Sequence, residues 1–388
     1  MIRNPAVIVA LLLAIEAAVL FLAGNKRTKH LFSFLPSVFW IYFIPMLAAT
    51  FGLIDTKNPV FGLITTYLLP ASLLLLLLPV DIRAIWRLGH TALAMFFIGA
   101  AGIIAGAVLS FGIFRQFVGA QFWSGFGALS ASWTGGSANM IAVKEALSVP
   151  DAVFAPMVIV DTVVPYLWMG LLIAGVALQK GFDAWVKADS RVIDELSSQA
   201  SAAWERAAAR LTAGGIIILL ATAAAGSMAA QLLARQMPVV KDVVSPYTWV
   251  IIIVSMMGIL LSLTPARRLE EYGSSRVGYY ILYFVLTAIG AKASIASIGS
   301  AVTLIIAGFL IVLVHALFLL VGARLMKAPM FLVASASQAN IGGVASAPVV
   351  AEVYQPGLAS VGLLLAILGN ILGTYMGIFC AQLCRMLL

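Results

Sequence analysis

Two short polar, glycine-rich stretches interrupt apolar sequence, one in each half of the chain, and their oxygen atoms could bind an ion or a solute. The first reads Ser-Ala-Ser-Trp-Thr-Gly-Gly-Ser-Ala-Asn at 130–139, and the second reads Ser-Ala-Ser-Gln-Ala-Asn-Ile-Gly-Gly at 335–343. Ser132 and Ser337 lie 205 residues apart in a chain of 388. Small and polar residues at membrane depth free backbone groups that hydrocarbon cannot satisfy. Paired breaks of this kind in two halves of a chain predict a transporter's substrate site.

The hydroxyl, amide and freed carbonyl oxygens of the two stretches are neutral ligands that suit Na⁺, because they can replace its hydration shell. Helix N-termini at the breaks would favour a carboxylate or phosphate group of a solute. We therefore predict these substrate-binding residues: Ser132, Thr134, Gly135, Gly136, Ser137, Asn139, Ser335, Ser337, Gln338, Asn340, Gly342 and Gly343. The alternative is close helix packing through small residues, which explains one stretch more easily than two matching ones.

Asp161 is an acid within an apolar span and is followed by Pro165. A carboxylate at that depth costs about 2.5–3.5 kcal/mol, so we expect it to face a partner or a wet cavity. The predicted ion-coupling residues are Asp161, Asn139, Asn340 and Asn370, and a Na⁺ site could form from Thr134, Asn139, Asp161 and Gln338. The alternative for Asp161 is a structural hydrogen bond to a neighbouring helix.

Other polar residues in apolar surroundings have simpler explanations. Glu16 could pack at an interface, His315 is expected to be a satisfied structural residue, and the two cysteines are expected to be buried apolar residues. The lysines could contact an anion, Lys292 more readily than Lys144, although both could instead mark the water boundary. These residues are Glu16, Lys144, Glu145, Lys292, His315, Glu352, Cys380 and Cys384.

The composition excludes a soluble globular protein, since 63% of residues are hydrophobic, 10% are charged and the mean hydropathy is +1.08. We predict an all-α polytopic membrane protein with about twelve spans and a retained first span. The expected spans are 5–23, 34–54, 60–79, 89–112, 118–148 (broken), 152–178, 211–234, 247–265, 277–296, 300–323, 328–352 (broken) and 358–384. Basic residues lie in short loops, which explains the net charge of +8 without nucleic-acid binding.

The spans divide into two groups of six around a polar segment at 179–210, which we expect to be a linker or an interfacial helix. Residues 1–178 and 211–388 would then form two repeats, each with one broken helix. Loop charges favour inverted repeats, whereas an even spacing of six spans between equivalent helices implies parallel ones. We favour inversion, and the parallel arrangement stays open.

The stretch Trp-Thr-Gly-Gly-Ser-Ala-Asn at 133–139, together with 335–343, Pro348 and Asn370, resembles the YjcL-type bacterial membrane proteins over nearly the whole chain. That family is similar, more distantly, to the cation:proton antiporter and bile-acid:sodium symporter superfamily. The resemblance implies inverted repeats, a panel domain and a core domain, and two discontinuous helices that cross near the membrane midplane. The paired Asp-Asp or Asn-Asp motif of the antiporters is absent, because Asp161 stands alone.

These observations favour a secondary transporter of a small organic, preferably anionic, solute that is coupled to Na⁺ or H⁺. A monovalent cation:proton antiporter, an intramembrane enzyme and a non-transporting sensor remain alternatives. No nucleotide-binding, metalloprotease or nucleophile-elbow motif is present, so we expect no enzyme and no cofactor other than Na⁺. The expected partners are the solute and membrane lipid, with a homodimer open, and the expected location is the bacterial inner membrane.

Overall fold

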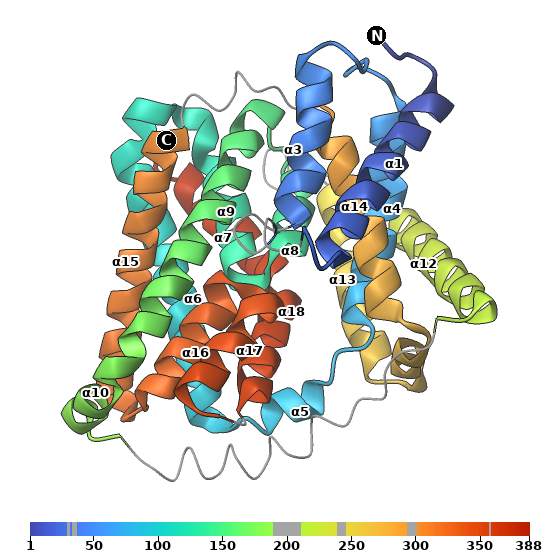
Figure 1. The fold of residues 1–388 in the computed structure, drawn as a ribbon. Helices are drawn as coiled ribbons and strands as arrows, with labels where there is room; N and C mark the ends of the chain where they lie inside the picture. Colours follow the sequence, from blue (N-terminus) through green and yellow to red (C-terminus); the bar gives the residue numbers. More distant parts are fainter. Residues whose placement is uncertain (29–31, 33–36, 189–210, 239–245, 293–300, 357) are drawn as a thin grey trace. The chain divides into compact units, whose positions relative to one another are not determined.

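The computed structural model describes residues 1–28, 32, 37–188, 211–238, 246–292, 301–356 and 358–388, and the elements of this part are helical (Figure 1). Each of the twelve predicted apolar segments contains a helix or a pair of helices. The twelve counterparts, in chain order, are α1 (Pro5–Gly24), α3 (Ser37–Thr50), α4 (Val60–Leu77), α6 (Gly89–Val118), α7 (Trp123–Gly135) with α8 (Ser137–Ala146), α9 (Asp151–Ala174), α12 (Ala213–Ala234), α13 (Pro246–Ser262), α14 (Ser274–Gly290), α15 (Ala301–Met326), α16 (Met330–Ile341) with α17 (Gly343–Tyr354), and α18 (Ala359–Arg385).

Seven helices of the described chain are long and apolar enough to cross a membrane, or up to eight if a pair bent by 95° is one span. The bent pair is α13 with the 3₁₀ segment η3 (Pro265–Tyr272). The protein is therefore an all-helical, multi-pass membrane protein, and the total of twelve spans stays a prediction. One helix extends past its predicted span: α6 continues beyond residue 112 through Arg115 and Gln116 to Val118, and it ends at Gly119, whose φ is 103°.

The described chain forms two compact units, and each unit combines segments from both sequence halves. Unit 1 comprises Met1–Val80, Lys144–Thr162 and Ala209–Val302, and unit 2 comprises Asp81–Val143, Val163–Ala208 and Thr303–Leu388. The predicted division into repeats at 1–178 and 211–388 stays a prediction. Within the polar segment 179–210, a short helix α10 covers Gln179–Val186, while residues 189–210 lie outside the described part.

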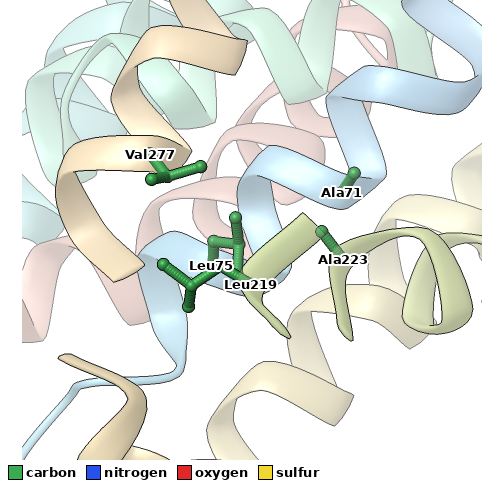
Figure 2. Packing of buried hydrophobic residues seen from close by; sticks show 5 residues of the cluster. All are labelled: Ala71, Leu75, Leu219, Ala223 and Val277. Carbon is green, nitrogen blue, oxygen red and sulfur yellow. The ribbon is translucent and has the colours of Figure 1, made fainter. Parts of the chain in front are cut away.

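Unit 1 is organised around α4, whose apolar face packs against α12 and α14 (Figure 2). The core residues of this contact are Ala71, Leu75, Leu219, Ala223 and Val277. Pro70 lacks an N–H group, so it cannot donate the usual helical hydrogen bond to the carbonyl of Thr66, four residues earlier. The side chain of Gln231 on α12 donates to that carbonyl at 3.2 Å, which binds α12 to α4 where the helix is weakened.

Unit 2 is held by close approach of helix backbones at small residues. A Cβ atom added at Gly102 or Gly106 of α6 would lie 2.8 Å from backbone atoms of α15. Similarly, a Cβ at Gly377 of α18 would lie 2.9 Å from the carbonyl oxygen of Gly127 on α7. Small residues allow this spacing between helices in a membrane. They position α7 and α18 firmly around the first polar stretch.

Candidate functional site

Both polar stretches contain a helix boundary at a glycine with positive φ. α7 ends at Gly135 and α8 begins at Ser137, and between them Gly136 has φ 83° and ψ 173°. α16 ends at Ile341 and α17 begins at Gly343, which has φ 64°. Only glycine adopts the Gly136 conformation readily. These boundaries fall within the two predicted stretches, and the prediction that each pair is one discontinuous membrane-spanning helix stays a prediction.

The two boundaries lie side by side within unit 2. A Cβ added at Gly343 would be 4.0 Å from the Cα atom of Gly136, although the glycines are far apart in sequence. The side-chain oxygen of Asn370 on α18 lies 3.5 Å from the position of a Cβ at Gly136. The structure therefore brings together both predicted stretches and one further predicted residue.

Asn139 joins the first stretch to α18 through both the nitrogen and the oxygen of its side-chain amide. Its Nδ2 donates to the carbonyls of Gly135 at 2.6 Å and Asn370 at 3.2 Å, and its Oδ1 accepts from the backbone N–H of Thr374 at 2.9 Å and from that residue's hydroxyl at 2.5 Å. These bonds use the donors and the acceptor of the amide. In this state Asn139 acts as a structural clamp, and its predicted role as an ion ligand would require these bonds to change.

Thr134, Gln338 and Asn340 each have a buried side-chain oxygen without a hydrogen-bond partner among the described residues. These atoms are Thr134 Oγ1, Gln338 Oε1 and Asn340 Oδ1, and Ser130 Oγ shares this property. Gln338 uses its Nε2 to donate to Ser346 Oγ at 2.7 Å, while Gly342 lies against this pair. Buried polar atoms are normally satisfied, so unpaired oxygens of this kind suggest a site for a ligand.

Two predicted serines of the second stretch are already bonded. Ser335 donates to the carbonyl of Phe331 at 2.7 Å in its own helix. Ser337 Oγ lies 2.9 Å from His315 Nε2 and 2.9 Å from Trp168 Nε1. Of the two serines predicted in the first stretch, Ser132 is buried and Ser137 is half-buried. Together these contacts make Ser335 and Ser337 poorer solute ligands than the unpaired oxygens.

Sequence reasoning missed the glycines of α18 that hold the first boundary. A Cβ at Gly369 would overlap the carbonyl oxygen of Thr134, and a Cβ at Gly373 would lie 2.8 Å from the Cα atom of Gly135. The available signal was the spacing Gly369, Gly373 and Gly377, since glycines four apart mark a packing face in a membrane helix. The small residues of the first stretch thus serve packing as well as providing oxygens.

Asp161 lies in the part of α9 that belongs to unit 1, and its side chain is half-buried. Its proposed charge in the ion site stays a prediction. Among the described residues, no three His, Cys, Asp or Glu side chains gather closely enough to form a metal-ligand group.

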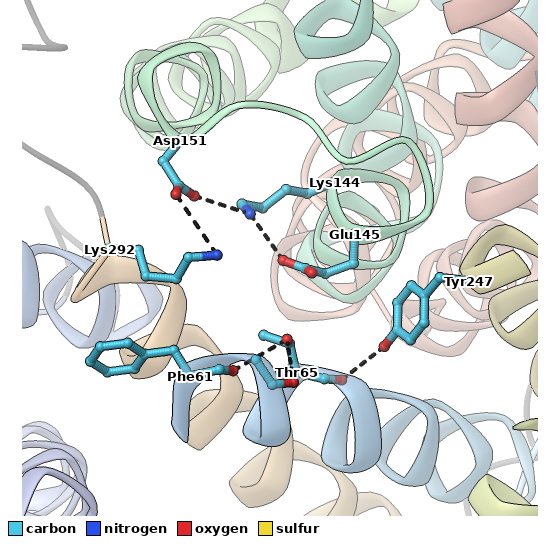
Figure 3. A network of polar contacts seen from close by, with 8 residues as sticks. Phe61, Thr65, Lys144, Glu145, Asp151, Tyr247 and Lys292 are labelled. Atoms are coloured by element: carbon cyan, nitrogen blue, oxygen red, sulfur yellow. Dashed lines mark hydrogen bonds and ion pairs between the residues drawn. The ribbon is translucent and has the colours of Figure 1, made fainter. Parts of the chain in front are cut away.

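A second polar cluster lies in unit 1 around Lys144 (Figure 3). Its ammonium group lies 2.9 Å from Glu145 Oε1 and 3.1 Å from Asp151 Oδ1, and Lys292 Nζ lies 3.9 Å from Asp151 Oδ2. Lys144 is only 3% exposed, so the prediction that it marks a water boundary was wrong. Two carboxylates compensate its burial, because a lone charge would be costly there.

A family model described as "Protein of unknown function (DUF819)" matches residues 10–387. The chain belongs to the DUF819 family. It is also 24% identical over 356 residues to the uncharacterized membrane protein YjcL of Bacillus subtilis (strain 168), a match that covers 86% of each chain. The predicted resemblance to YjcL-type proteins is confirmed, while the more distant superfamily resemblance stays a prediction.

Proposed function

We propose that this DUF819 protein is a secondary active transporter of a small organic solute, with an anionic solute favoured, coupled to Na⁺ or H⁺ by alternating access. The single observation that supports this proposal is the meeting of two glycine boundaries, Gly136 and Gly343, beside buried oxygens without partners. Broken helices that meet inside a membrane protein offer freed backbone groups and helix ends to an ion or substrate.

The coordination chemistry of the unpaired oxygens favours a cation at this position. Thr134, Gln338 and Asn340 present neutral acceptors, and Asn370 lies beside Gly136 from a third helix. Hard cations such as Na⁺ prefer oxygen ligands, and neutral ones avoid trapping the ion too tightly for release. The positive ends of α8 and α17, which begin at the boundaries, would favour a carboxylate of the solute.

The proposal includes twelve spans in two inverted repeats in a bacterial inner membrane. In support, the helix pair α7 and α8 is followed by the long helix α9, and the pair α16 and α17 is followed by the long helix α18. Each pair is also preceded by a long helix, α6 or α15. This matching order is what an internal duplication would produce.

Ion binding can be tested on purified protein by thermal unfolding in NaCl, KCl and choline chloride at constant ionic strength. A ligand that binds the folded state stabilises it, by about 2.7 kcal/mol at a concentration 100 times its Kd. We expect Na⁺ or pH to stabilise the wild type and Thr134→Val to weaken the response, because Thr134 Oγ1 is an unpaired buried oxygen. Thr222→Val is the matched control, since its hydroxyl donates to Ile218 within an exposed helix turn.

Three outcomes distinguish cation binding at the proposed site, cation binding elsewhere and the absence of coupled transport. A cation response that is lost in Thr134→Val and kept in Thr222→Val supports the site. A response that both variants keep would show that the cation binds elsewhere. No response to Na⁺, K⁺, pH or a library of small carboxylates would refute the proposed coupled transport.

A further inference from the structure

His315 is a fully buried residue in the middle of α15, and both of its ring nitrogens are bonded. Nδ1 lies 2.8 Å from the carbonyl oxygen of Gly99 on α6, and Nε2 lies 2.9 Å from Ser337 Oγ on α16. Trp168 Nε1 lies 2.9 Å from the same hydroxyl. A histidine between three helices of unit 2 is thus connected directly to the second polar stretch.

The donors and acceptors of these groups fix the direction of each bond. A carbonyl can only accept, so His315 Nδ1 carries a proton and donates to Gly99. An indole N–H can only donate, so Trp168 donates to Ser337 Oγ. His315 is fully buried, and a charged ring would be costly there, so we assign Nε2 as the unprotonated nitrogen of a neutral ring that accepts the hydroxyl proton of Ser337. The chain of donation runs from Trp168 through Ser337 and His315 to Gly99.

The amide of Asn340 is oriented on the same side of α6. Its Nδ2 donates to the carbonyls of Phe96 at 3.2 Å and Ala336 at 2.9 Å. Both partners are acceptors, so the amide nitrogen must face them and Oδ1 must point away. That oxygen is buried and has no partner among the described residues.

Gly99 stands between the two groups. A Cβ at this position would lie 2.8 Å from Asn340 Nδ2 and 3.0 Å from His315 Cε1. His315 and Asn340 therefore both pack against Gly99. Through Ser337 and Asn340 these contacts hold α16 at a fixed rotation against α6. A change of ring tautomer or position would be transmitted to the residues of the second stretch.

We propose that His315, in its neutral Nδ1-protonated form, is a positioning residue of the second polar stretch. By fixing Ser337 it sets the rotation of α16, so that Asn340 Oδ1 and Gln338 Oε1 remain available as ligand oxygens. This inference rests on the proposed function for its effect on ligand binding. The tautomer and the hydrogen-bond chain do not depend on that function.

The first test is a spectroscopic one on the full-length protein in detergent. The chain has three histidines, and selective ¹⁵N labelling with His30→Gln and His90→Gln isolates the His315 signals. We expect one pyrrole-type and one pyridine-type nitrogen, with Nδ1 as the pyrrole-type one. Ser337→Ala should shift the Nε2 resonance, whereas Ser335→Ala, two residues away and bonded within its own helix, should leave it unchanged. An Nε2-protonated or rapidly exchanging ring would overturn the proposal.

The second test uses the cation response described above. Gly99→Ala places a methyl group against both the histidine and the asparagine, and we expect it to weaken cation binding by roughly tenfold, as loss of one or two good hydrogen bonds does. Gly112→Ala is the control on the same helix, because its nearest neighbour would be 3.5 Å from the Cβ. His315→Phe should weaken binding, while His315→Gln, which keeps an acceptor for Ser337, should recover part of it.

The outcomes distinguish this inference from the proposed function. A wild type without any ligand response refutes the transporter site, and the ¹⁵N spectra still decide whether the hydrogen-bond chain exists. A responsive wild type with an unchanged response in His315→Phe and Gly99→Ala would overturn the positioning role.

Discussion

Substitution of Gly136 by alanine tests whether the first polar stretch contains a real helix boundary. The added Cβ has space, because the nearest atom, Asn370 Oδ1, would be 3.5 Å away. The cost therefore comes from the backbone, whose φ of 83° and ψ of 173° belong to a region that is essentially restricted to glycine. Holding another residue there costs about 1–3 kcal/mol.

The measurement is the melting temperature of purified variants at one scan rate, since unfolding of such proteins is often irreversible. At roughly 2–4 °C per kcal/mol for a large domain, Gly136→Ala should melt about 2–12 °C below the wild type. Gly170→Ala is the matched control: it lies in helix α9 with nothing within 4 Å of the new Cβ, so no loss is expected.

An unchanged melting temperature for Gly136→Ala would refute the reasoning, because a continuous helix at this position would accept alanine readily. The neighbouring glycine is unsuitable for this test. A Cβ at Gly135 would overlap the carbonyl oxygen of Gly369, so its substitution would measure packing against α18 and not backbone conformation. A double alanine variant would mix the two effects.

Two further predictions concern charged residues. Lys144→Met should lower the free energy of unfolding by about 1.5–3 kcal/mol, because the charge-assisted contacts of Lys144 with Glu145 and Asp151 are lost while both carboxylates stay partly exposed. The exposed Lys180→Met should have little effect in the same thermal assay. Asp161→Asn should remove a Na⁺-dependent or pH-dependent stabilisation of the protein if this acid supplies the charge of the ion site; a full ion response in the variant would make Asp161 a structural residue.

The positions of the helices could be predicted from sequence because hydrocarbon imposes a strict requirement. A backbone within a membrane must satisfy its hydrogen bonds internally, so long apolar runs have to be helical. Every predicted apolar segment contains a helix for this reason, and a helix boundary falls at each of the two glycine pairs. The end of α6 was missed, because Arg115 and Gln116 end the apolar run without ending the helix, which continues to Gly119.

The sequence predicted which polar residues lie at the candidate site, but it could not predict which of them are already hydrogen-bonded within the protein. Ser337 and Asn139 read as free oxygens in the sequence, yet the structure places them against His315 and Thr374. Conversely, nothing local distinguishes Asn340, whose acceptor remains unpaired. A polar side chain in a helix can serve packing, capping or binding, and only its neighbours determine which.

The sequence by itself determined that this chain is a helical membrane protein with two matching polar interruptions, since hydropathy and glycine placement act over a few neighbouring residues. Only the tertiary structure decided that Gly136 and Gly343 meet, that α18 holds the first boundary, and that Lys144 is buried between carboxylates. The contact of Gly136 with Gly343 and the contacts of α18 with the first boundary join residues far apart in the chain, and the burial of Lys144 depends on the helices packed around it. They depend on which helix faces approach one another, and that choice is made by packing over the whole unit and not by any local pattern.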